Sequence, residues 1–302
     1  MDAEIISFGS GIARVLSQPG LRGRVHSVFK HTVNLKIADR LLSLQHSVLP
    51  KTPSMLLVEP GFVLGDFRLA VGDRVMVKED NIVIKGHGFK LATARRWEGQ
   101  LPVYFTGEEE VNFLGREVAR ALTLLDLPQL DFGLPGHSGQ AVPWLEDLVV
   151  AGNGAGDAAM ISALTSLIGL GPGLTPSGDD FLLGFLSVLS LLEKGNRPRS
   201  AFATALRRRI REGIQDTSPL SREFLFCACG GEYSEPFHEL YKAAGRQDVM
   251  GLVQAVLCFT QIGHTSGTAA LAGLLYGLDF CAKDTGRSGE NDYPQCGEEE
   301  LL

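Results

Sequence analysis

The chain has 302 residues, 44% of them hydrophobic and 21% charged, and its formal net charge is −7. This length allows one large domain or two ordinary ones, and it is enough to bury a core without disulfides or a structural metal. The acidic total argues against a nucleic-acid-binding protein that works by neutralising phosphates.

Nothing in the sequence predicts export or a membrane span. The N-terminus lacks the basic start and the apolar stretch of a signal peptide. The longest apolar run, 181–192, is shorter than the ~20 residues needed to cross a bilayer. Five cysteines without a C-x2-C pair indicate neither a disulfide framework nor a zinc cage. We therefore expect a cytoplasmic protein that binds neither membrane nor nucleic acid.

The first hundred residues predict β-structure. Their apolar residues fall in short, β-branched or alternating runs separated by polar breaks, which is typical of an antiparallel sandwich or small barrel. The acidic turn at Glu79 and Asp80 predicts a hairpin between the last two strands. We place this β-rich domain at 1–104. The predicted strands are 24–29, 32–37, 54–58, 74–77 and 81–84.

From residue 105 the hydrophobic period lengthens to that of a helix, beginning with the apolar face of 111–125. Ser218 and Asp248 have the residue type and position of helix N-caps. The fold class is therefore α+β, with an N-terminal antiparallel β barrel or sandwich followed by a larger, mostly α-helical domain over 105–283. The acidic segment 284–302 is predicted to be disordered. Further helices are predicted at 158–168, 176–194, 200–213, 219–229, 236–244, 249–261 and 266–281.

A glycine-rich segment at 169–180, GLGPGLTPSGDD, precedes one of these helices. A hydroxyl residue before a proline predicts a helix start, and the unpaired N–H groups of such a start form a ready anion site. Glycine inside the first turn costs about 1 kcal/mol against Ala, which makes sense if something passes close to the backbone. The candidate anion-binding residues here are Gly171, Gly173, Thr175, Ser177 and Gly178.

Two adjacent acids, Asp179 and Asp180, are the candidate catalytic residues of this segment. The spacing of Gly173 and Gly178 is that of a P-loop, but the two acids replace the Lys-Ser/Thr that would hold phosphates and magnesium. They could orient an amine or amide, bind Mg²⁺ or act as a base. They point about 100° apart on a helix, so only one is expected to face a ligand. Alternatively, both only complement the helix dipole above a tight glycine turn.

A second segment, GHTSG at 263–267, also ends one helix and begins another. It shares the pattern S-G-x3-L-x-G with the first segment, 89 residues apart, so the two helix starts could face one pocket from opposite sides. Chance similarity is the alternative. His264 is a candidate catalytic residue, as a proton donor or a cation beside an anion, or it bonds a carbonyl at the helix end. The anion-binding candidates are Thr265, Ser266 and Gly267.

A third helix start, TSPLSR at 217–222, has two hydroxyls and an arginine. The planar guanidinium of arginine binds both oxygens of a carboxylate or phosphate at once, although a solvated arginine is an equal alternative. The anion-binding candidates in this segment are Thr217, Ser221 and Arg222.

The sequences GLGPGLTPSGDDFLLG (169–184) and IGHTSGTAALAGLLYG (262–277) resemble the AllH-like family. This family includes a subunit of the oxamate carbamoyltransferase of anaerobic allantoin breakdown. The resemblance is strongest over about 165–280. It implies transfer of a carbamoyl group between carbamoyl phosphate and oxamate, yielding oxalurate, in a complex with other subunits.

The resemblance and the residues together suggest roles for the candidate groups. The 171–178 loop would bind the phosphate or carboxylate end of the substrate. Asp179 or Asp180 would orient the amide nitrogen, and His264 with Ser266 would stabilise charge on the departing phosphate. No cofactor is predicted, although Mg²⁺ could bind the carboxylates. The alternatives are a metal-dependent hydrolase with Asp179 and Asp180 as ligands, and a non-catalytic subunit whose glycine loop docks a partner.

Overall fold

The computed structural model describes residues 2–61, 63–102, 105, 108–124, 156–194, 200–263 and 265–283. The chain forms two compact units. The first comprises Met1–Pro102, Gly173–Thr175 and Arg207–His238, and the second comprises Val103–Pro172, Pro176–Leu206 and Glu239–Leu302. The predicted division into continuous domains, 1–104 and 105–283, therefore differs from the compact units, because a stretch of helical sequence packs with the β-strands. The predicted tail at 284–302 lies outside the described residues.

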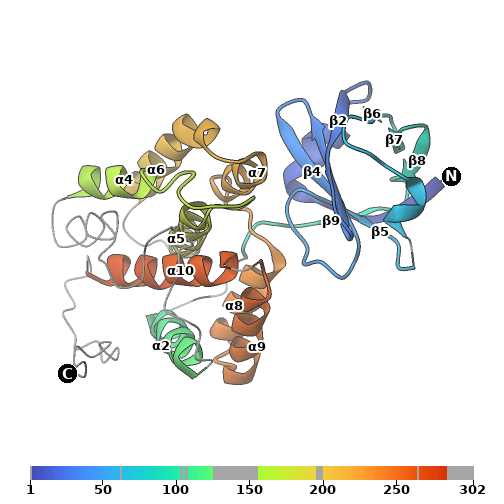
Figure 1. Cartoon of the computed structure of the whole chain (residues 1–302). Helices are drawn as coiled ribbons and strands as arrows, with labels where there is room; N and C mark the ends of the chain where they lie inside the picture. Colours follow the sequence, from blue (N-terminus) through green and yellow to red (C-terminus); the bar gives the residue numbers. More distant parts are fainter. Residues whose placement is uncertain are drawn as a thin grey trace, which may run out of the picture. The chain divides into compact units, whose positions relative to one another are not determined.

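The first unit contains a closed barrel (Figure 1). Its strand order is β5-β4-β3-β2-β6-β7-β8-β1, and β1 pairs with β5 to close it, while β9 adds to β1. The strands are β1 (Asp2–Gly9), β2 (Arg22–Val28), β3 (Thr32–Ile37), β4 (Arg40–Gln45), β5 (Met55–Val58), β6 (Arg74–Val77), β7 (Asn81–Ile84), β8 (His87–Lys90) and β9 (Arg95–Trp97).

The predicted β barrel is confirmed, and β2, β3, β5, β6 and β7 match the predicted strands. The predicted hairpin is the antiparallel pair β6–β7, in which Val77 faces Ile82. Most pairings are antiparallel, but β4–β5, β1–β8 and β1–β9 are parallel. Parallel neighbours need longer connections than hairpins, and the sequence pattern of a short strand does not reveal its partner.

The barrel encloses an apolar core. Alternate residues of β6 and β7 are buried, as expected of strands with one face inward. Nearly every residue of β4 is buried, because α7 packs against this strand. This coverage explains why apolar and polar residues do not alternate along β4. Among the largest buried side chains are Ile5, Leu35, Leu42, Ile82 and Phe89.

The predicted helices are confirmed with small differences at their ends. Ser218 caps α7 by accepting the N–H of Ser221 at 3.1 Å, and Asp248 caps α9 by accepting the N–H of Gly251 at 2.9 Å. In the described part of the chain, no helix is long and apolar enough to span a membrane. The helices are α1 (Ala13–Leu16), α2 (Glu108–Leu124), α4 (Asp157–Thr165), α5 (Ser177–Lys194), α6 (Ser200–Gly213), α7 (Pro219–Ala228), α8 (Glu235–Gly245), α9 (Val249–Thr260) and α10 (Ser266–Lys283).

A buried ion pair joins α7 to the barrel within the first unit. The guanidinium of Arg40 on β4 donates two bonds from Nε to the Glu223 carboxylate, at 3.1 and 3.0 Å, and another from Nη2. Glu223 also accepts the N–H of Leu41 at 2.9 Å. Burial by itself would lower the pKa of Arg40, but the hydrogen bonds and charge of Glu223 outweigh it and raise that pKa. Arg40 is thus charged at neutral pH and paired with Glu223.

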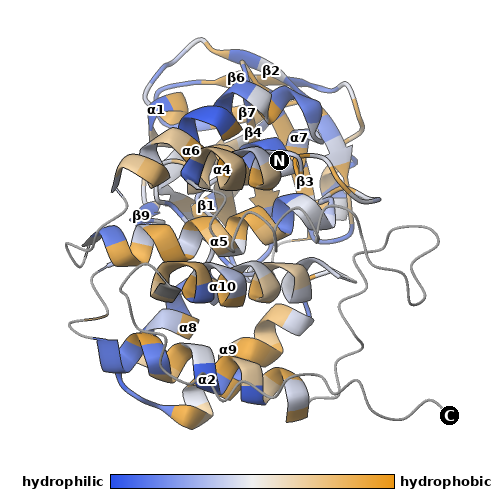
Figure 2. Cartoon of the chain, turned by 90° about the vertical axis from the view of Figure 1, so that its left-hand side faces the viewer, coloured by the Kyte–Doolittle hydropathy of each residue, from blue (hydrophilic) through white to orange (hydrophobic). Residues whose placement is uncertain are grey.

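The second unit is built on the helix pair α5 and α10, which lie side by side in Figures 1 and 2. Both helices are mostly apolar (Figure 2), and α5 is buried over nearly its whole length. A helix that is apolar on all sides is expected in a core.

Glycines allow the two backbones to approach closely. A Cβ at Gly184 would lie 1.8 Å from the carbonyl oxygen of Ala270, and a Cβ at Gly273 would lie 1.9 Å from that of Phe181. These contacts are reciprocal, because Gly273 and Ala270 lie 89 residues after Gly184 and Phe181. The repeated pattern S-G-x3-L-x-G therefore has a structural basis: each copy supplies one glycine to the same interface.

We expect Gly273→Ala to destabilise the second unit. Its methyl group would overlap the Phe181 backbone and force the helices apart, at a cost of about 3 kcal/mol or more in unfolding free energy. Gly277→Ala is the matched control on the same helix, because its Cβ would meet the Val188 side chain at 3.3 Å. The gain in helix propensity should hold this control within about 1 kcal/mol of the parent. Urea unfolding curves that coincide for the two variants would contradict the close packing.

We expect Glu223→Gln to destabilise the first unit by about 3 kcal/mol, because it leaves the buried guanidinium of Arg40 without its counter-charge. Glu239→Gln removes one side of an exposed pair with Lys242 and should change stability by no more than about 0.5 kcal/mol. Chemical denaturation measures both values. Equal midpoints for the two variants would show that the Arg40 pair does not hold α7 on the barrel.

Candidate functional site

The two glycine-and-hydroxyl segments meet at the start of α5 and α10. The hydroxyl oxygens of Ser177 and Thr265 lie 3.3 Å apart, and either can be the donor. Ser177 is 2% exposed, whereas Thr265 and Ser266 are half-buried. Two predicted site segments that are far apart in sequence are thus adjacent in the second unit.

The two helices run in the same direction. Their contacts advance together, from Ser177 with Thr265, through the Gly184 and Gly273 contacts, to Gly277 with Val188. Both N-termini therefore lie at one end of the pair, side by side rather than on opposite sides of a pocket. The positive ends of the two helix dipoles lie together, which favours a negative charge at this end.

The loop before α5 has a backbone that only glycine adopts easily. Gly171 and Gly173 have φ angles of +113° and +96°, and Gly169 has +73°. The sequence predicted Thr175 as the N-cap of this helix. Because α5 begins at Ser177, Thr175 lies one residue before the N-cap position. Thr175 is half-buried, while the residues from 172 to 174 are exposed.

Gly178 and Gly267 serve packing. A Cβ at Gly178 would lie 2.2 Å from the carbonyl oxygen of Leu167, and a Cβ at Gly267 would lie 1.7 Å from that of Phe259. The group that passes close to these glycines is therefore the protein's own backbone. In both segments, glycine lets the helix fold back against the chain that precedes it.

The two acids of the first turn of α5 are both buried. Asp179 is 0% exposed, and its Oδ1 accepts the N–H of Gly169 at 2.9 Å, which ties the glycine loop to the helix. Asp180 is 4% exposed. In the part of the chain that the structure describes, no group of three or more His, Cys, Asp or Glu side chains could hold a metal ion. His264, the other predicted catalytic residue, lies outside the described residues.

The third candidate segment lies at the start of α7, in the first unit. The Ser218 hydroxyl donates to the carbonyl of Leu174 in the glycine loop, a contact that the sequence did not predict. Arg222 donates to the carbonyls of Ile214, Gln215 and Thr217 at 3.1–3.3 Å, so its guanidinium organises the turn before α7. Thr217 and Ser221 are buried.

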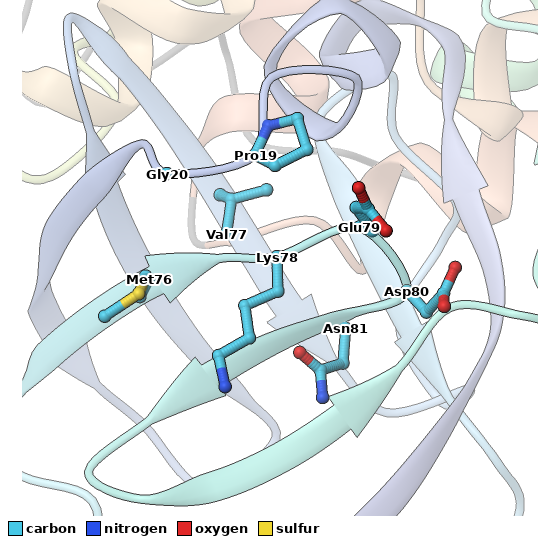
Figure 3. Close-up of a pocket in the computed structure, with 8 residues that line it drawn as sticks. All are labelled: Pro19, Gly20, Met76, Val77, Lys78, Glu79, Asp80 and Asn81. Atoms are coloured by element: carbon cyan, nitrogen blue, oxygen red, sulfur yellow. The ribbon is translucent and has the colours of Figure 1, made fainter.

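A shallow depression of about 450 Å³ lies on the barrel, next to the β6–β7 hairpin (Figure 3). Figure 3 shows Met76 on β6 and Lys78 just after it, with Glu79 and Asp80 at the turn that follows. None of the predicted site residues lines this depression. Its mixed charges and open form do not suggest a ligand.

Both halves of the chain match models of one protein family. The model of the oxamate carbamoyltransferase subunit AllH matches residues 167–278, and that of the AllH family N-terminal domain matches residues 4–96. The chain belongs to the AllH family. The N-terminal match spans nearly all of the barrel, and the other match includes the two helix starts that meet at Ser177 and Thr265. Among curated proteins and solved structures there is no significant match to this AllH-family chain.

Proposed function

We propose that this chain is the substrate-binding subunit of a carbamoyltransferase that acts on carbamoyl phosphate and oxamate. In this proposal, the joint N-terminal end of α5 and α10 binds the phosphate group. The observation that carries it is the 3.3 Å contact between the hydroxyls of Ser177 and Thr265, which brings the two family segments to one end of a parallel helix pair. The family name supports a role in oxamate carbamoyl transfer.

The chemistry of the reaction matches what such an end offers. The oxamate nitrogen forms a bond to the carbamoyl carbon while the bond to the phosphate oxygen breaks, and the nitrogen loses a proton. Phosphate leaves with added negative charge, which backbone N–H groups and hydroxyl donors at helix starts stabilise. The carboxylate of Asp180, beside this end, would orient the amide N–H groups.

Magnitudes show which groups must contribute most. One helix N-terminus stabilises a nearby anion by about 0.3–1 kcal/mol when exposed and up to about 2 kcal/mol when partly buried. Two helix N-termini alone do not account for tight phosphate binding, because the buried acids Asp179 and Asp180 lie beside them and repel an anion. Asp179 already directs one oxygen to the N–H of Gly169, which offsets part of its charge. The Ser177 and Thr265 hydroxyls must then add hydrogen bonds to a charged group, each contributing about 1.5–3 kcal/mol.

Other subunits complete the enzyme in this proposal. The matched family is described as a subunit of the transferase, which supports a complex. We propose that this chain supplies the phosphate-binding end and that partner chains supply further groups around the substrate. Asp180 is the candidate catalytic acid or base of this chain, and His264 stays a prediction.

We expect phosphate and carbamoyl phosphate to raise the unfolding temperature of the full-length chain. A ligand at 100 times its dissociation constant stabilises a fold by about 2.7 kcal/mol. Ser177→Ala and Thr265→Ala should each weaken phosphate binding at least tenfold, because each removes a hydrogen bond to a charged group. Isothermal calorimetry measures the change.

The control for this experiment is Ser166→Ala. Ser166 is an exposed hydroxyl at the C-terminal end of α4, where no free N–H groups are available to an anion. It should bind phosphate like the parent. Unchanged phosphate binding in Ser177→Ala would refute the proposed site. A Ser177→Ala variant that binds phosphate normally but loses co-purifying subunits would favour the docking function instead.

A further inference from the structure

The first turn of α7 holds a buried hydroxyl that lacks a hydrogen-bond partner. Ser221 is 1% exposed, and its Oγ bonds to no group in the described part of the chain. An unsatisfied buried polar group costs about 1–3 kcal/mol, so proteins rarely keep one without a reason. Ser221 belongs to the third segment that the sequence singled out, and the proposed phosphate site does not use it.

The charges at the start of α7 favour an anion at this end of the helix. Ser221 lies in the first turn of a ten-residue helix, where the dipole is positive. The next residue, Arg222, bonds only to backbone carbonyls among the described residues, so no carboxylate neutralises its charge. Glu223 is compensated by Arg40, and Asp216 is exposed to solvent.

A neighbouring loop contacts the start of α7. The Ser218 hydroxyl, which accepts the N–H of Ser221, donates to the carbonyl of Leu174. Leu174 is 54% exposed, and Gly173 beside it has a φ of +96° with open space around its Cα. The group bonded to this helix start is therefore an exposed loop residue.

We propose that the N-terminal end of α7 binds the carboxylate of a small organic acid, with Ser221 as the hydrogen-bond donor. A carboxylate suits this end better than a phosphate, because the end offers one free hydroxyl and one uncompensated positive charge. A phosphate dianion needs several donors around its oxygens. The identity of this acid rests on the proposed function, in which the second anionic substrate is oxamate. The binding site itself does not rest on it.

The test compares two serines that differ in position but match in burial. Ser54, before β5, is also 1% exposed, and its Oγ also lacks a hydrogen-bond partner among the described residues, but it is not at a helix start. Calorimetric titration of the full-length chain with oxamate, at constant ionic strength in chloride, is carried out on the parent, Ser221→Ala and Ser54→Ala. Any subunits that co-purify are retained.

We expect oxamate binding at least tenfold weaker in Ser221→Ala and unchanged in Ser54→Ala. Without ligand, both variants should unfold at or above the temperature of the parent, because each loses an unsatisfied hydroxyl. The absence of oxamate binding in the parent, or its full retention in Ser221→Ala, would overturn the proposal. So would a lower unfolding temperature of Ser221→Ala, since the hydroxyl would then have a structural role.

Phosphate titrations separate this inference from the proposed function. Ser221→Ala should bind phosphate like the parent, and Ser177→Ala should bind oxamate like the parent. Phosphate binding that depends on Ser221 would overturn the carboxylate assignment. Normal phosphate binding in Ser177→Ala would refute the proposed phosphate site and leave the oxamate result to decide the α7 site independently.

Discussion

The close approach of α5 and α10 is the contact on which the second unit depends. Gly184 and Gly273 each admit a carbonyl oxygen of the other helix at a distance that no Cβ would tolerate. Because the contacts advance together from Ser177 with Thr265 to Val188 with Gly277, the two helices run in the same direction and their N-termini lie together. That direction also has a cost, since two positive dipole ends repel. An anion bound at this end would be attracted by both dipoles and would offset their repulsion. For this reason the same geometry suggests a function.

The first unit uses a different device to hold a helix. The barrel closes through pairing of β1 with β5, and α7 is fixed to β4 by the buried pair of Arg40 and Glu223. The first turn of this helix contains the buried hydroxyl of Ser221. The glycine loop residue Leu174 bonds to this helix start.

Several residues that looked functional have structural roles as well. Gly178 and Gly267 stand where a ligand was expected near the backbone, but the neighbouring group is a carbonyl of the same chain. Asp179 holds the loop at Gly169, and Arg222 binds three carbonyls. The residue types in these segments are equally suited to binding an anion and to building a tight turn. Sequence alone therefore does not separate the two uses.

Local sequence determined the elements of this protein. Helical periodicity, the caps Ser218 and Asp248, and the acidic turn before β7 act over a few residues, so they were predictable. Only the tertiary structure decided that Ser177 meets Thr265, that α7 packs on the barrel, and that β4 is covered on both faces. These outcomes join residues far apart in the chain. They depend on packing the whole core, which no local pattern encodes.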